Sequence, residues 1–168
     1  MFKATIYSIF ILKIVEYSSY GLIAMKIIVA IDFSDISDKV LEIAADLAQK
    51  TQASLWLIHV VQPEPDYIGY DVGPKSERHF IAKEFQKKHV LLQDTADRLK
   101  KKKLEVTPLL IQGPTVETIL LESEKLKPDM IITGSHGQGA MTHLLMGSVS
   151  KGILKKSKVP VLIVPSVD

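Results

Sequence analysis

The 168-residue sequence contains no cysteine, a single tryptophan and little excess charge of either sign. Without cysteine the chain can form no disulfide bond, thiolate nucleophile or zinc–sulfur centre. The formal net charge of +2 is small for a dedicated nucleic-acid binder, which usually concentrates basic residues on one face. We therefore expect no nucleic-acid partner, and a cytoplasmic location fits the absence of cysteine.

The sequence also lacks an uninterrupted apolar segment of membrane-spanning length. Residues 4–12 are apolar, but Lys13 and Glu16 follow, and a span would place both charges near the bilayer centre at about 2.5–3.5 kcal/mol each. Met25 begins a segment typical of the start of an α/β domain. We expect residues 1–24 to be a leader or a mis-assigned upstream start, and residues 25–168 to form a single domain. A membrane anchor and an ordered extra element are the alternatives for residues 1–24.

Short apolar runs alternate with helical patterns from Met25 onward. Strands are predicted over residues 27–31, 53–61, 104–111, 129–133 and 159–164. The intervening helices are predicted after residue 34, over 77–102, after Gly113-Pro114, and over about 146–156. This alternation predicts an α/β fold, a Rossmann-like, five-stranded, mostly parallel sheet with helices on both faces. Pro108 within the third strand favours an edge position, because proline cannot donate to a sheet ladder.

Two helices have apolar patterns that predict their buried faces. The first begins with Ser34 or Ser37 as a capping residue and buries four apolar residues at helical spacing: Ile36, Val40, Ile43 and Leu47. The helix over 77–102 has its predicted inner face at Ile81, Phe85, Leu92, Ala96 and Leu99.

A glycine motif follows the fourth predicted strand. Its parts are Gly134-Ser135-His136-Gly137, nine further residues, and then Gly147-Ser148 at the start of a predicted helix. Glycines allow close backbone approach to a ligand, and the free N–H groups of a helix N-terminus favour an anion. A P-loop is excluded because Ala140 and Met141 follow Gly139. The dinucleotide fingerprint is excluded because Asp32-Phe33-Ser34 follows the first strand without a glycine.

The chain resembles the universal stress protein family from about Met25 to Pro165. The resemblance lies in the glycine motif and in VAIDFS at 29–34, IHVV at 58–61 and PVLIVP at 160–165. It implies an adenine nucleotide alpha hydrolase-like fold, a homodimer, a role in stress response, and binding of ATP or AMP.

The resemblance also implies a role for each matching residue. Asp32 would anchor the nucleoside or a hydrated Mg²⁺, and the backbone of Val60 would hold adenine. Gly134 and Gly137 would pass close to the ribose and phosphates. The phosphates themselves would be held by Gly147, Ser148, Val149 and Ser150.

Physical chemistry adds further candidates and alternatives at this site. Ala30 and Ile31, with Val60, can form an apolar slot for adenine, and His136 either contacts phosphate or faces solvent. Helix capping is the alternative role for Asp32 and for the serines of the motif. Gln138 and Thr142 stand where many family members carry basic residues, which weakens triphosphate binding or favours AMP.

The sequence gives no catalytic residue, because no nucleophile lies beside a base and no carboxylates form an obvious pair. His59, His79 and His89 show no metal-ligand spacing, so no protein metal site is predicted. We expect at most slow ATP hydrolysis. Two alternatives remain, namely a nucleotide hydrolase on a related fold and a dimer that works by protein contacts without nucleotide. The apolar strand over 159–164 is the expected dimer surface.

Overall fold

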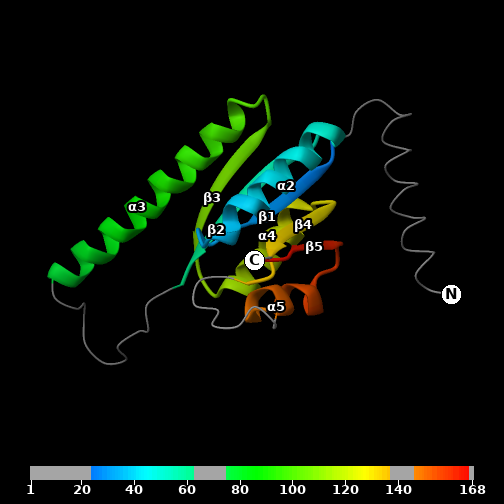
Figure 1. Ribbon diagram of the computed structural model, residues 1–168. Helices are drawn as coiled ribbons and strands as arrows, with labels where there is room; N and C mark the ends of the chain where they lie inside the picture. Colours follow the sequence, from blue (N-terminus) through cyan, green and yellow to red (C-terminus); the bar gives the residue numbers. More distant parts are fainter. Residues whose placement is uncertain (1–23, 63–74, 137–145, 167–168) are drawn as a thin grey trace.

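The computed structural model describes residues 24–62, 75–136 and 146–166 (Figure 1). Residues 1–23 of the expected leader and Gly137 of the glycine motif lie outside the described residues. The strands are β1 (Lys26–Ala30), β2 (Ser54–Val61), β3 (Val106–Gln112), β4 (Met130–Gly134) and β5 (Val161–Val164). The helices are α2 (Ile36–Thr51), α3 (Lys75–Lys100), α4 (Thr115–Leu126) and α5 (Ser148–Lys156).

The five strands form one parallel sheet in the order β3-β2-β1-β4-β5. This confirms the α/β fold predicted from the alternation of apolar runs and helical patterns. It also confirms the edge position of the strand that contains Pro108, which lies opposite Leu57 of β2. At an edge, one side of the strand makes no ladder bonds, so the missing N–H of a proline is tolerated.

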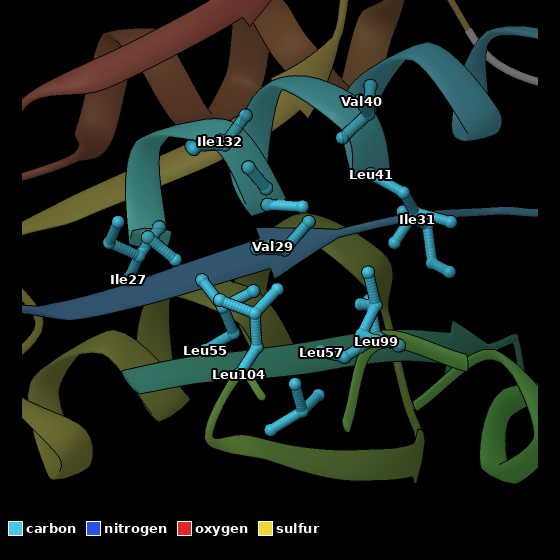
Figure 2. Close-up of a cluster of buried hydrophobic side chains, with 14 of the residues drawn as sticks. Ile27, Val29, Ile31, Val40, Leu41, Leu55, Leu57, Leu99, Leu104 and Ile132 are labelled. Carbon is cyan, nitrogen blue, oxygen red and sulfur yellow. The ribbon is translucent and has the colours of Figure 1, made fainter. Parts of the chain in front are cut away.

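Two buried clusters lie on opposite faces of the sheet. Successive residues of β1 alternate between them, with Ile27 and Val29 in one cluster and Ile28 and Ala30 in the other. Helices α2 and α3 cover the first face, where Val40 and Leu41 meet β1 (Figure 2). Helices α4 and α5 cover the second face. The strands are therefore apolar on both sides, as expected for a covered parallel sheet.

The predicted inner faces of α2 and α3 are correct in part. Ile36 and Val40 of α2 are buried, but Ile43 and Leu47 only flank the core, while the buried stripe continues through Leu41, Ala44, Ala45 and Ala48. On α3, Leu92, Ala96 and Leu99 are buried.

The prediction for Phe85 of α3 is wrong, because this side chain is 36% exposed. The helix has 26 residues and is therefore about 39 Å long. The eight residues of β2 span only about 26 Å. Figure 1 shows the N-terminal half of α3 extending past the strands, where the sheet no longer covers an apolar side chain.

Neither serine predicted to cap α2 does so. Asp35 occupies the capping position without a side-chain bond to the helix. The hydroxyls of Ser34 and Ser37 instead donate to Oδ1 of Asp32, at 2.5 and 3.3 Å. The carboxylate attracts both donors, because an ionised acceptor forms a stronger hydrogen bond than a neutral one.

Candidate functional site

The candidate site lies at the carboxyl ends of the strands, where the strand order reverses. The chain passes from β1 outward to β2 and β3 on one side, and β4 and β5 lie on the other. The segments that follow β1 and β4 are therefore neighbours, with Ala30 of β1 opposite Thr133 of β4. Ligands of parallel α/β sheets bind at this kind of crevice.

The turn after β1 is built around the carboxylate of Asp32. Its Oδ1 accepts a bond of 3.0 Å from the backbone N–H of Ser34, in addition to the two serine hydroxyls. The next residue, Phe33, has a φ of 61°. This left-handed conformation costs a residue with a Cβ about 1–2 kcal/mol, so other contacts must stabilise it. Asp32 thus orders the turn that precedes α2.

The segment after β4 is joined to the start of α5 by hydrogen bonds. The carbonyl of Ser135 accepts from the N–H of Gly147 at 2.7 Å and from the hydroxyl of Ser150 at 3.1 Å. The same hydroxyl donates to the carbonyl of Gly134 at 2.9 Å. Ser150 is only 2% exposed, so its side chain acts here as a buried link between β4 and α5.

The two described glycines of the motif, Gly134 and Gly147, lie where the Cβ of any other residue would be crowded by a neighbouring atom. A Cβ on Gly134 would lie 2.8 Å from Cγ2 of Ile36 in α2. A Cβ on Gly147 would lie 3.2 Å from the carbonyl oxygen of Ser135. Both glycines therefore permit close packing of β4, α2 and α5 around the crevice.

No side chain of the residues that the structure describes caps the N-terminus of α5. Gly147 occupies the capping position, and no side chain of the described residues bonds to the first turn there. The N–H groups of a first turn have no partner within their own helix, and the helix dipole adds partial positive charge. Ser148 and Val149 belong to this turn, with Ser148 exposed and Val149 half-buried.

One ring nitrogen of His136 is buried and has no hydrogen-bond partner within residues 24–62, 75–136 and 146–166. Its Nδ1 lies 2.9 Å from the hydroxyl of Ser135, and that hydroxyl also accepts from the N–H of Ser166 at 3.1 Å. Its Nε2 is buried, and no group of the described residues bonds to it. Buried polar atoms are nearly always hydrogen-bonded, so an unpartnered one requires an explanation.

A second histidine, His59 of β2, lies behind the Asp32 turn and is 6% exposed. Its Nδ1 is 2.8 Å from the carbonyl oxygen of Ile31, and its ring centroid is 4.7 Å from that of Phe33. Burial lowers the pKa of His59, an effect strengthened by Lys88 and opposed by the Ile31 bond and by Asp32. The imidazole of His59 therefore stays neutral to a lower pH than that of a solvated histidine.

A pocket of about 430 Å³ opens between the starts of α4 and α5. Ser148 and Val149 form one wall, and the remaining lining residues are Gln62, Pro114, Thr115, Val116 and Glu117. The start of α4 also has no side-chain cap among the described residues. Two helix N-termini therefore line one pocket.

The start of α4 and Gln62 were not predicted as part of the site. The Gly113-Pro114 turn marked a helix start in the sequence, but only the fold of the parallel sheet, in which β3 lies beside β2 in the order β3-β2-β1-β4-β5, brings this turn near Ser148. The pocket volume lies within the range of about 300–1,000 Å³ typical of small-molecule sites.

The predicted site residues that the structure describes all gather at the carboxyl edge of the sheet. Ala30 and Ile31 are buried at the end of β1, and the half-buried Val60 lies near the end of β2. The N–H of Ile31 donates to the carbonyl of Ile58 at 3.0 Å, which keeps the ends of β1 and β2 together. Roles for these residues in holding a ligand stay predictions.

The described residues contain neither a metal-binding cluster nor a membrane-spanning helix. No cluster of three or more histidine, aspartate or glutamate side chains capable of holding a metal ion occurs among them. None of the helices within residues 24–62, 75–136 and 146–166 combines the length and apolar character that a membrane crossing requires.

Comparison with known proteins gives consistent matches. The sequence model of the Universal stress protein family matches residues 24–165. The universal stress protein YxiE of Bacillus subtilis is 30% identical over 144 residues, which cover 83% of this chain and 97% of that protein. The solved structure of hypothetical protein MJ0577, a universal stress protein of Methanocaldococcus jannaschii, has a TM-score of 0.73. It is 25% identical and covers 88% of this chain and 99% of that chain.

A universal stress protein from Archaeoglobus fulgidus, solved in complex with dAMP, also shares the fold. Its TM-score is 0.59 at 23% identity, with 84% of this chain and 98% of that chain covered.

Proposed function

Because the chain belongs to the universal stress protein family, we propose that it binds an adenine nucleotide, ATP or AMP, at the carboxyl edge of its sheet. The nucleotide would regulate a stress response through a change in shape or partner, with at most slow hydrolysis of ATP. The protein would act as a homodimer in the cytoplasm.

The observation that carries the proposal is the start of α5 beside the end of β4, which no side chain of the described residues caps. Ser150 ties this first turn to Gly134, so its N–H groups have a fixed position. Gly147 lets the turn approach the carbonyl of Ser135 closely. Such a turn is suited to phosphate oxygens, and Ser148 adds an exposed hydroxyl. We assign the phosphates to this turn.

The buried Nε2 of His136 supports the same assignment. In the tautomer in which Ser135 donates to Nδ1, Nε2 carries the hydrogen and is a donor. A phosphate or ribose oxygen would then be its partner. Gly137 follows directly in the sequence and is proposed, with Gly134, to lie along the ribose and phosphates.

The base would lie in the apolar slot near the ends of β1 and β2. Ala30 and Val60, on the sheet face covered by α4 and α5, would supply apolar surface, whereas the side chain of Ile31 packs on the opposite face. The backbone of Val60 would supply hydrogen bonds to the adenine edge. Val149 and Val116 add apolar walls in the neighbouring pocket. The Archaeoglobus fulgidus protein solved with dAMP shares this fold, which supports adenine as the base proposed for this site.

Mg²⁺ would accompany the phosphates and need no site made of protein groups alone. Magnesium usually keeps several waters and takes one or two carboxylates together with substrate phosphates. Asp32 is the carboxylate proposed for this role, directly or through water.

Calorimetric titration of the full chain with ATP, AMP, GTP and GMP in the presence of Mg²⁺ tests the proposal. We expect saturable binding of ATP or AMP at one site per chain, with the guanine nucleotides at least tenfold weaker. Equal binding of adenine and guanine nucleotides would contradict the adenine assignment. No binding of any of them would leave the protein-contact dimer as the better account.

The proposed dimer would use β5, which lies at an edge of the sheet and pairs with β4. Leu162 of this strand is 36% exposed, and an apolar edge favours pairing with a second copy. Light scattering at micromolar concentration should give the mass of a dimer. The variant Leu162→Lys should give a monomer, and Leu121→Lys, at an exposed position of α4, should remain dimeric. A wild-type monomer would contradict this part of the proposal.

A further inference from the structure

His59 is a polar side chain in an otherwise apolar part of β2. It is 6% exposed, and both Leu57 and Ile58 before it belong to the buried core. Its Nδ1 lies 2.8 Å from the carbonyl oxygen of Ile31. A carbonyl oxygen can only accept, so Nδ1 carries the hydrogen and donates it. The backbone of Ile31 is thereby held on both sides, because its N–H donates to Ile58.

The same imidazole supports the residue on the other side of Asp32. The ring of Phe33 packs against that of His59 at 4.7 Å between centroids, with an angle of 58° between the planes. The ammonium of Lys88, from α3, lies 5.6 Å from the centroid of the Phe33 ring. Phe33 has a left-handed backbone with φ of 61°, which needs such support.

We propose that His59 is a positioning residue for the nucleotide site, which holds both neighbours of Asp32 by its hydrogen bond to Ile31 and its contact with Phe33. The inference rests on the proposed function, because Asp32 is the proposed anchor of the nucleotide. His59 acts through the turn and touches no ligand itself. It also precedes Val60, so one side chain fixes the two segments proposed to hold the nucleoside.

Two substitutions separate the hydrogen bond from the volume of the ring. His59→Asn places an amide N–H near the position of Nδ1 and so retains a donor to Ile31. His59→Leu retains apolar volume and removes the donor. Binding of AMP with Mg²⁺ to the full chain is measured by calorimetry, and unfolding in urea is followed by the fluorescence of Trp56, the single tryptophan.

We expect His59→Leu to bind AMP at least tenfold more weakly than the wild type, and His59→Asn to stay within about threefold of it. Wild-type affinity in His59→Leu would overturn the positioning role and leave the proposed function intact. Equal weakening in both variants, in step with their loss of stability, would show that His59 only packs. Failure of the wild type to bind AMP would overturn both proposals.

A variant at the contacted residue tests the same link if His59→Leu does not fold. Phe33→Gly adopts a positive φ without strain and removes the ring that His59 supports. We expect AMP binding about two- to threefold weaker, as in His59→Asn, which loses the same ring contact. In the double variant Phe33→Gly with His59→Asn, the loss should be no greater than in Phe33→Gly alone, because the ring contact is already gone. Unchanged binding in Phe33→Gly would contradict the support of the turn by this contact.

Discussion

The hydroxyl of Ser150, in the first turn of α5, donates a hydrogen bond of 2.9 Å to the carbonyl oxygen of Gly134 at the end of β4. Sixteen positions separate these residues in the sequence, and the intervening segment includes most of the glycine motif. The bond fixes where α5 begins relative to the sheet. The proposed phosphate site therefore depends on a buried side chain as well as on the glycines.

The first prediction concerns this buried link. Ser150→Ala removes the buried hydroxyl that donates to the carbonyls of Gly134 and Ser135, and the Ser135 carbonyl keeps only its bond from the N–H of Gly147. We expect a loss of about 1–3 kcal/mol in the free energy of unfolding, measured by urea denaturation without ligand. Ser148→Ala is the matched control, because the same change at an exposed position should stay within about 0.5 kcal/mol. Equal stability of the two variants would contradict the structural role of Ser150.

The second prediction separates the motif glycine from a glycine that packs elsewhere on α5. Gly147→Val forces atoms against the carbonyl of Ser135, 3.2 Å from the position of a Cβ. We expect AMP affinity to fall at least tenfold in calorimetric titration, with the circular dichroism spectrum retained. Gly152→Ala meets Val116 in the contact of α4 with α5 and should change stability more than affinity. Full affinity in Gly147→Val would exclude this turn as the phosphate site.

The third prediction follows from the charge of Glu117 in the pocket. Its carboxylate lines the pocket with Ser148 and pairs with Lys156 at 3.3 Å. Glu117→Gln removes a negative charge that repels phosphate and releases Lys156 from its partner. We expect about two- to threefold tighter binding of ATP at low salt, and a smaller gain at high salt, because exposed charges are screened.

Glu122→Gln is the control for the third prediction. Glu122 lies on the same helix and pairs with Lys125, outside the pocket. This variant should bind ATP as the wild type does. A gain of the same size in both variants would point to the net charge of the protein instead of the pocket.

The fourth prediction concerns pH and stability. Burial sets the pKa of His59 below the value of 6.5 that it has in the unfolded chain, and Lys88 lowers it further, against the Ile31 bond and Asp32. Between the two pKa values the unfolded chain binds more protons, so stability rises with pH there. The stabilising contribution is complete above pH 6.5 and is lost as the pH falls towards the folded-state pKa.

Urea denaturation at pH 7.5 and pH 5.5 measures this dependence. The wild type should lose more stability between these pH values than His59→Asn, because asparagine has no titratable group at position 59. His89→Asn, at an exposed position of α3, should behave as the wild type does. The same loss in His59→Asn and in the wild type would assign the effect to other groups.

The sequence predicted the order of the elements because each strand is a short apolar run bounded by polar or turn residues. It also predicted the edge position of β3 from one residue, Pro108, whose missing donor has a direct structural consequence. The exposure of Phe85 was not predictable from periodicity, because it depends on where the sheet ends beneath α3.

The described part of the glycine motif was visible as a local pattern, but its supporting contacts were not. Ser34 and Ser37 were expected to cap α2, whereas both donate to Asp32. Whether such a hydroxyl bonds to the helix or to Asp32 depends on the geometry of the turn between β1 and α2. The pocket combines Gln62, Thr115 and Ser148, residues that only the sheet topology brings together. A histidine inside an apolar strand was the one signal for His59, and its contacts with Ile31 and Phe33 require the fold.

The most direct test of the account is to identify what the purified full chain carries. The protein is denatured, and any released nucleotide is identified by mass spectrometry and quantified per chain, with Gly147→Val prepared in parallel. We predict ATP or AMP near one equivalent in the wild type and a strongly reduced amount in the variant. A wild type that releases no nucleotide and fails to bind added ATP or AMP with Mg²⁺ would contradict a nucleotide site at the carboxyl edge of the sheet.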